Sequence, residues 1–152
     1  MGIGAVAEGC DDIVVTDTAA RLGIDDRQLR QLAEETKEEV ARRIRTYRNN
    51  NELPELNDKD VVLVDDGLAT GVTAEAALIA IRQHEPKTLI LAVPVGSRES
   101  VTRLKTIADD VACLLIPQHF FAVGEWYDDF AQTTDDEVVE ALTRAARFRP
   151  VW

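Results

Sequence analysis

Residues 61–73 read Val-Val-Leu-Val-Asp-Asp-Gly-Leu-Ala-Thr-Gly-Val-Thr, and this stretch decides the fold of the chain. The first four residues are aliphatic and three of them are β-branched, which predicts a short strand that is buried on both faces, as in a parallel sheet. The strand stops at two adjacent carboxylates, Asp65 and Asp66. A turn with two glycines follows, and from Thr73 the residues are helix-forming. Strand, acidic pair, Gly/Thr turn and helix together predict a unit that holds a phosphorylated sugar.

Each part of this unit has a chemical use. Ligands of open parallel sheets bind at the carboxyl ends of the strands, so Asp65 and Asp66 are expected at the mouth of a site. Free amides of the turn and of the first helical turn form a nest for an anion, helped by the positive end of the helix dipole. Gly71 lets a phosphate approach the main chain, and Thr70 and Thr73 add hydroxyl donors. The carboxylates suit sugar hydroxyls or the water shell of Mg²⁺.

This run resembles the phosphoribosyl-pyrophosphate (PRPP) motif of type I phosphoribosyltransferases, in which a hydrophobic strand and two acidic residues precede a Thr-Gly-x-Thr turn. The resemblance implies that Asp65 and Asp66 are catalytic, hold the ribose 2- and 3-hydroxyls and bind Mg²⁺ through water rather than directly. It also implies that the 5-phosphate lies against the segment from Ala69 to Thr73. The implied substrate-binding residues are Asp65, Asp66, Gly67, Ala69, Thr70, Gly71, Val72 and Thr73.

Two other interpretations of the acidic pair are weaker. Phosphoacceptor receiver domains carry such a pair near the chain start, with an acceptor Asp at the end of the next strand. Here the pair is in the middle of the chain, and the next predicted strand ends in Pro94-Val95-Gly96-Ser97, without an Asp. A purely structural role, a parallel strand with a solvated acidic end, leaves the Thr-Gly-x-Thr turn unexplained.

Strands and helices alternate along the rest of the chain. Residues 3–7 and 13–16 are predicted to be two strands joined by a turn, with the spacing of a hairpin. Further buried strands are predicted at residues 61–65, 88–93 and 111–116, with helices at about residues 25–47, 73–84 and 97–107 and a final helix from the capping box at 134–137. This order favours right-handed crossovers and an α/β fold with a mostly parallel, doubly wound sheet and flanking helices, in one domain spanning residues 1–152.

The composition excludes several classes of protein. The formal net charge is −11, which argues against nucleic acid as a partner. No run of 18 apolar residues is present, and the first residues lack the basic region of a signal peptide, so we expect no membrane association. Cys10 and Cys113 fit neither a zinc site nor a disulfide framework, which indicates free thiols in a reducing cytoplasm. The acidic surface is that of a salt-adapted, halophilic protein or of an ordinary acidic cytoplasmic one.

Five of the eight aromatic residues lie in one segment, residues 117–130. They could pin the last helix over the edge of the sheet, form a dimer patch, or stack on a flat base beside the ribose site. For the last role the candidates for base contact are Trp126 and Tyr127, together with Arg98, which follows the second strand of the sheet.

The resemblance covers matching segments from Gly4 to Gln132, nearly the whole chain. Members of the family normally carry an upstream Pro-Arg-Gly-Gly-type loop for pyrophosphate and then a mobile catalytic loop, and this chain begins after both, so we expect an N-terminally shortened form. Purine-salvage relatives place an Asp where Ala69 stands, so no carboxylate is available there for proton transfer to a base.

We therefore expect a Mg²⁺-assisted transferase that moves ribose 5-phosphate from PRPP to a nitrogenous acceptor, with loss of pyrophosphate. The alternative is a non-catalytic ribose-phosphate or nucleotide-binding module that lacks the pyrophosphate loop. In either case an exposed sheet edge favours a homodimer.

Overall fold

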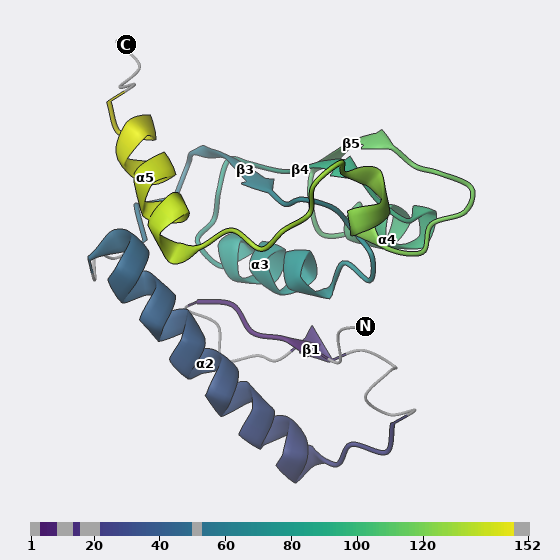
Figure 1. Cartoon of the computed structure of the whole chain (residues 1–152), viewed down its shortest axis with the longest axis horizontal. Coiled ribbons are helices and arrows are strands. Elements are labelled where there is room, and N and C mark those ends of the chain that lie inside the picture. The colour runs from purple at the N-terminus through teal and green to yellow at the C-terminus, as the bar shows by residue number, and fades with distance from the viewer. Residues whose placement is uncertain (1–3, 9–13, 16–21, 50–52, 148–152) are drawn as a thin grey trace.

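The computed structural model describes residues 4–8, 14–15, 22–49 and 53–147 (Figure 1). The elements follow in the order β1 (Gly4–Ala5), β2 (Val14–Val15), α2 (Asp26–Arg48), β3 (Asp60–Val64), α3 (Val72–Arg82), β4 (Thr88–Val95), α4 (Arg98–Leu104), β5 (Asp110–Leu115), the 3₁₀ turn η1 (Val123–Trp126) and α5 (Asp135–Ala145). Helix α3 lies between the sheet of β3, β4 and β5 and the β1–β2 hairpin, with α2 beyond the hairpin (Figure 1).

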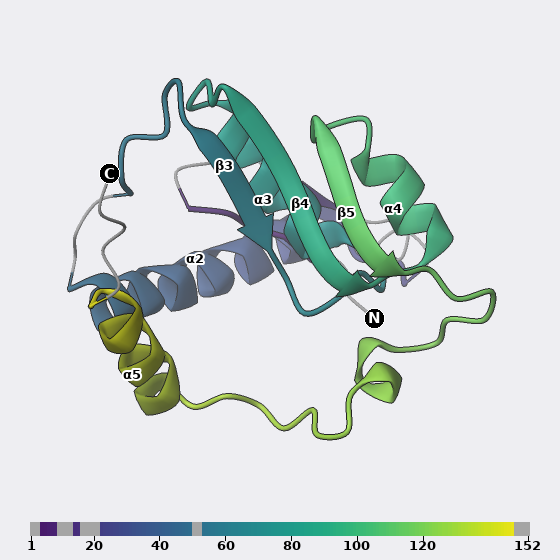
Figure 2. The ribbon, with the colours of Figure 1, turned by 90° about the horizontal axis from the view of Figure 1, so that it is seen from above.

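Strands β3, β4 and β5 form a parallel sheet in this order (Figure 2). Val64 of β3 pairs with Ala92 of β4, and Val95 of β4 pairs with Leu115 of β5. All three strands therefore end at the same edge of the sheet, from which the chain continues toward α3, α4 and the aromatic residues. The predicted α/β class, with a mostly parallel sheet flanked by helices, is confirmed.

The hydrophobic core lies between the sheet and helices α3 and α4. Leu78 of α3, Leu91 of β4 and Leu104 of α4 are completely buried. Burial of a leucine side chain stabilises a fold by roughly 1.5–3 kcal/mol. Leu68, in the turn after β3, is also completely buried and forms a parallel bridge with Gly96 after β4. The turn that carries the predicted site is thus part of the core.

The other face of the sheet is exposed, and the predicted burial of β3 and β5 is wrong for this face. Val62 and Val64 of β3 are 54% and 71% exposed, and Leu114 of β5 is 87% exposed. Helices α3 and α4 both lie on the opposite face (Figure 1), because two successive right-handed crossovers between neighbouring parallel strands bring their helices to the same side. An aliphatic run predicts a strand, but it does not say how many faces of the strand are covered.

Strands β1 and β2 pair in an antiparallel manner, as predicted, and contact α3. The predicted turn between them, with Cys10, lies outside the described residues. Helix α2 begins after Asp25, whose side chain accepts a hydrogen bond from the Gln28 amide, while the Gln28 side chain accepts one from the Asp25 amide. This reciprocal cap fixes the start of the helix and is typically worth about 1 kcal/mol.

Helix α5 begins at the predicted capping box, in which the Thr134 side chain accepts a hydrogen bond from the Glu137 amide. It packs against α2, where Asp135 accepts hydrogen bonds from Arg42 at 2.6 Å and from Tyr47 at 2.5 Å. The interpretation that the aromatic residues pin this helix over the sheet edge is therefore wrong. The contact partner of α5 is α2, on which acidic and basic side chains supply the attachment.

Residues 117–134, which we call the aromatic segment, connect β5 to α5 and run past the carboxyl edge of the sheet (Figure 2). The turn η1 is the only helix or strand in this segment. Its side chains are poorly covered, since Phe121 is 81% exposed. Within the part of the chain that the structure describes, every helix is too short or too polar to cross a lipid bilayer.

Candidate functional site

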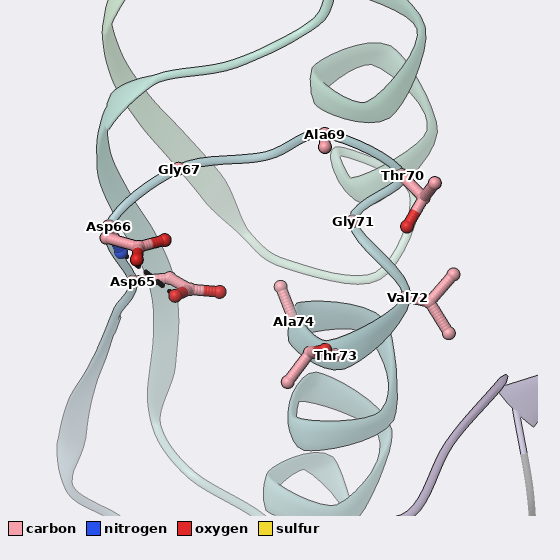
Figure 3. A pocket seen from close by; sticks show the side chains of 9 residues that line it. All are labelled: Asp65, Asp66, Gly67, Ala69, Thr70, Gly71, Val72, Thr73 and Ala74. Atoms are coloured by element: carbon pink, nitrogen blue, oxygen red, sulfur yellow. Dashed lines mark hydrogen bonds between the residues drawn. The ribbon is translucent and has the colours of Figure 1, made fainter. Parts of the chain in front are cut away.

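A cavity of about 200 Å³ opens at the carboxyl end of β3 (Figure 3). It is bounded by the acidic pair on one side and by the first turn of α3 on the other. All eight residues of the predicted substrate-binding set line it, and Ala74 is added to them: Asp65, Asp66, Gly67, Ala69, Thr70, Gly71, Val72, Thr73 and Ala74. Ala74 was missed because an alanine in the first turn of a helix carries no signal of its own.

The carbonyl groups of residues 68–71, between β3 and α3, all accept hydrogen bonds from the protein. We call residues 67–71 the β3–α3 turn. The carbonyl of Leu68 accepts from the Ser97 amide at 2.9 Å, and the carbonyl of Gly71 accepts from the Glu75 amide at 2.9 Å. Between them, the carbonyls of residues 69 and 70 accept from side chains of α4 and of its N-cap. These four acceptors of the turn are therefore occupied within the protein.

The amide groups of the same turn have the opposite status. From Ala69 to Ala74, no amide donates a hydrogen bond to any other described residue. The first amides of a helix have no acceptor within the helix, and they add to the partial positive charge of its N-terminus. The cavity is thus bordered by a run of free donors, an arrangement that suits an anion such as phosphate.

Two glycines allow this shape. Gly71 has a φ of 69°, in the left-handed region, and a Cβ there would lie 3.2 Å from Leu104 and from Ser100. A Cβ on Gly67 would lie 2.8 Å from the Val123 side chain and 3.0 Å from the Val95 carbonyl, closer than a Cβ can approach. Both glycines are therefore required by close packing against neighbouring elements.

The two carboxylates of the acidic pair lie in different environments. Asp65 is partly buried and accepts a hydrogen bond from the Asp66 amide at 2.9 Å (Figure 3). Burial raises the pKa of the Asp65 carboxyl above its usual value; the hydrogen bond opposes this shift, and the nearby charge of Asp66 adds to it. Asp66 is exposed to solvent. The pair offers one desolvated acceptor and one hydrated acceptor at the mouth of the cavity.

The threonines differ in exposure. Thr73 is exposed at the start of α3 and Thr70 is partly exposed, and neither hydroxyl bonds to another described residue. In contrast, the Val72 side chain points away from the cavity (Figure 3) and is 4% exposed. Val72 therefore contributes its main chain to the cavity wall, while the threonines can also contribute hydroxyl donors.

The three candidates for base contact lie at different distances from this cavity. The Tyr127 hydroxyl donates a hydrogen bond to the Asp66 carbonyl at 2.7 Å, and its ring centroid lies 5.2 Å from that of Phe130. Trp126, which precedes it in η1, is 40% exposed. Arg98, the first residue of α4, is exposed and is not part of the cavity wall. The structure thus brings the aromatic segment to the acidic pair, but not Arg98 to the cavity.

A resident metal site made of protein groups alone is not found among the described residues, where no three His, Cys, Asp or Glu side chains cluster. The acidic pair fits the other mode of Mg²⁺ binding, in which the ion keeps several waters and contacts one or two carboxylates together with substrate phosphates.

Comparison with known proteins agrees with this arrangement. The family model described as phosphoribosyl transferase domain matches residues 14–129. The chain belongs to the type I phosphoribosyltransferase family. The match contains β3, the acidic pair, the β3–α3 turn, the rest of the parallel sheet and η1.

Individual relatives show the same similarity. The crystal structure of TT1426 from Thermus thermophilus is 40% identical and has a TM-score of 0.72, covering 95% of this chain and 68% of that one. Two Mycobacterium tuberculosis proteins, named "Putative phosphoribosyl transferase Rv0571c" and "Putative phosphoribosyl transferase MT0597", are 37% identical over 147 residues, which is 97% of this chain. The chain spans 33% of the length of these two mycobacterial relatives.

Proposed function

We propose that this chain binds the ribose 5-phosphate group of PRPP in the cavity at the end of β3 and transfers it to a nitrogenous acceptor, releasing pyrophosphate. The observation that supports the proposal best is the run of free amides from Ala69 to Ala74, in a turn whose carbonyls at residues 68–71 are all occupied. Charge-assisted hydrogen bonds of this kind are worth roughly 1.5–3 kcal/mol each, enough to bind a phosphate despite the acidic surface.

In this proposal the residues of the cavity divide into two groups. The amides of the β3–α3 turn and of the first turn of α3, with the hydroxyls of Thr70 and Thr73, hold the 5-phosphate. Asp65 and Asp66 accept hydrogen bonds from the ribose hydroxyls, and their negative charge stabilises the positive charge that develops at C1 in the transition state. Mg²⁺, when bound through water to the acidic pair, supplies charge that offsets the leaving pyrophosphate.

The transfer breaks the bond between ribose C1 and a pyrophosphate oxygen and forms a bond between C1 and a nitrogen of the acceptor, which loses a proton to water. Alanine stands at position 69, so that position supplies no carboxylate as the base. A flat acceptor would stack on the aromatic segment, with Trp126 and Tyr127 as the contacting residues, and Arg98 is retained as a further candidate. Stacking on an aromatic side chain is worth roughly 1–3 kcal/mol per base.

A second function is a binding or regulatory module that holds a ribose phosphate without turning it over. One observation favours it: the described lining of the cavity has two Asp but no Lys or Arg to receive a pyrophosphate. Calorimetric titrations with ribose 5-phosphate and with Mg·PRPP separate the two functions. A transferase binds Mg·PRPP more tightly and releases pyrophosphate when bases are added. A module binds both ligands equally and releases none.

The role of the acidic pair has its own test. Replacement Asp66→Asn removes one negative charge from the exposed rim of the cavity, so we expect Mg·PRPP to bind at least about tenfold more weakly. Unchanged affinity in calorimetry would rule out this role of Asp66.

We also propose a homodimer, as expected from the exposed edge of β3, the outer strand of the sheet. Light scattering coupled to size-exclusion chromatography measures this directly, and a mass of one chain, 16.8 kDa, would contradict it.

A further inference from the structure

We propose that Ser100 and Arg103 of α4, with the N-cap residue Ser97, are positioning residues that aim the free amides of the β3–α3 turn into the cavity. The inference rests on the proposed function, because it assigns these residues to phosphate binding at that site. None of the three lines the cavity, and they lie about 30 residues beyond the motif in the sequence.

The two serines hold one carbonyl. The Ser100 hydroxyl donates a hydrogen bond to the Ala69 carbonyl at 2.7 Å, and the Ser97 hydroxyl donates to the same carbonyl at 3.0 Å. Ser97 also accepts from the Ser100 amide as the N-cap of α4. Ser100 is 3% exposed and is the one buried polar residue among the described residues. A buried hydroxyl needs a partner, and the partner here is the turn.

Arg103 holds the next carbonyl and also a carboxylate. Its guanidinium donates to the Thr70 carbonyl and forms an ion pair with Glu75, which lies in the first turn of α3. The Glu75 side chain is 20% exposed, so its charge is poorly screened by water. Arg103 therefore neutralises a carboxylate that would otherwise oppose an anion at the start of α3.

The geometry of the peptide bond connects these contacts to the cavity. In a planar trans peptide, the carbonyl of one residue and the amide of the next point in opposite directions. When Ser100 holds the Ala69 carbonyl toward α4, the Thr70 amide must point away from α4. When Arg103 holds the Thr70 carbonyl, the Gly71 amide must do the same. The two amides have no other described acceptor, and both residues line the cavity.

Packing against the glycine strengthens the same connection. The Cβ position of Gly71 is 3.2 Å from Ser100 Cβ and 3.3 Å from Arg103 Nη2. The left-handed residue at the start of α3 is thus enclosed by the same two side chains that hold the carbonyls. The α4 side of the turn is fixed by these contacts, and the other side is open to a ligand.

The experiment measures binding of ribose 5-phosphate by calorimetry in the full chain and in Ser100→Ala, Arg103→Met and Arg103→Lys. We expect about fivefold weaker binding in Ser100→Ala and about tenfold weaker binding in Arg103→Met, because each change frees one peptide unit to rotate. Arg103→Lys keeps a charged donor and should recover most of the loss. The matched control is Thr102→Ala, whose hydroxyl bonds within α4, to the Arg98 carbonyl, and does not reach the turn; its affinity should stay within about twofold.

A second readout separates aim from general stability. In the unmodified chain, inorganic phosphate should shift the NMR signals of the Thr70 and Gly71 amides, and this shift should be reduced in Ser100→Ala and Arg103→Met but not in Thr102→Ala. Equal affinity and equal shifts in all variants would overturn the inference alone. If the unmodified chain binds neither ribose 5-phosphate nor phosphate, the proposed function is overturned, and the inference with it.

Discussion

The β3–α3 turn and the aromatic segment border the same cavity, but they are built differently. In the turn, each carbonyl from Leu68 to Gly71 has a donor, and Leu68 is completely buried. The aromatic segment reaches the site through the Tyr127 hydroxyl and the packing of Val123 on Gly67, while Phe121 remains 81% exposed. A rigid wall suits a group common to all substrates, the phosphate, and a loosely held wall suits the acceptor, which differs between enzymes.

The largest effect is expected for Gly71→Ala, which attacks the rigid wall. The change puts a Cβ on a residue with φ 69° and 3.2 Å from Leu104 and Ser100. We expect a loss of stability of about 1–3 kcal/mol and no measurable binding of ribose 5-phosphate. Gly23→Ala is the matched control, because Gly23 has a φ of 67° and nothing within 4 Å of a Cβ. It should lose about 1 kcal/mol and bind normally; equal behaviour of the two variants in thermal melts and calorimetry would show that the turn is not rigid.

Asp65→Asn is expected to have the next largest effect, with stability and binding changing in opposite directions. Burial raises the pKa of Asp65 in the folded chain, so the folded chain retains the proton to a higher pH than the unfolded chain. Stability therefore falls as the pH rises from the ordinary carboxyl pKa through the raised one. Asparagine escapes this loss.

At pH 7 the Asp65→Asn variant should melt at a higher temperature than the unmodified chain, and the difference should vanish in acid. Its affinity for ribose 5-phosphate should fall about tenfold, because a charged acceptor for the ribose hydroxyls is lost. A lower melting temperature at pH 7 would mean that Asp65 is stabilised by its neighbours rather than desolvated.

A smaller effect is expected from Tyr127→Phe, which loosens the second wall. The variant loses the hydrogen bond to the Asp66 carbonyl and keeps the ring beside Phe130. Ribose 5-phosphate affinity should stay within about twofold, since a partly exposed hydrogen bond is worth about 1 kcal/mol or less. Hydrogen exchange in the aromatic segment should become faster. A large loss of phosphate affinity would show that the two walls act as one unit.

The smallest effect is expected at the far end of the aromatic segment, where Asp135 joins α5 to α2. Hydrogen bonds from Arg42 and Tyr47 hold the pKa of the Asp135 carboxyl below its usual value. A depressed pKa contributes stability above the ordinary carboxyl pKa, and this contribution is lost as the pH falls through the depressed value. Asp135→Asn should therefore lower the melting temperature slightly at pH 7 and not in strong acid, with ribose 5-phosphate binding unchanged. Weaker binding would connect α5 to the cavity.

The sequence was informative where the structure depends on neighbours along the chain. The turn between β3 and α3 is local, and its glycines, threonines and acidic pair carry their conformational and chemical preferences wherever they occur. The exposed faces of β3 and β5 could not be predicted, because exposure depends on which elements cover the sheet. The contact of α5 with α2 depends on Asp135 meeting Arg42, 93 residues away.

The positioning residues were invisible to sequence analysis for the same reason. Ser97 was expected only to cap a helix, and neither Ser100 nor Arg103 belongs to a motif. Their relation to the turn follows from the parallel pairing of β3 and β4, which brings the start of α4 beside the residues after β3. Only the assembled sheet places them there.

The central claim is that the free amides of the β3–α3 turn and of the first turn of α3 hold a sugar phosphate. A crystal structure of the chain with ribose 5-phosphate tests it most directly. We predict that the phosphate oxygens lie within hydrogen-bonding distance, about 2.7–3.2 Å, of amides between Ala69 and Ala74, with the ribose hydroxyls at Asp65 and Asp66. A phosphate bound elsewhere, with these amides in contact only with water, would contradict the claim.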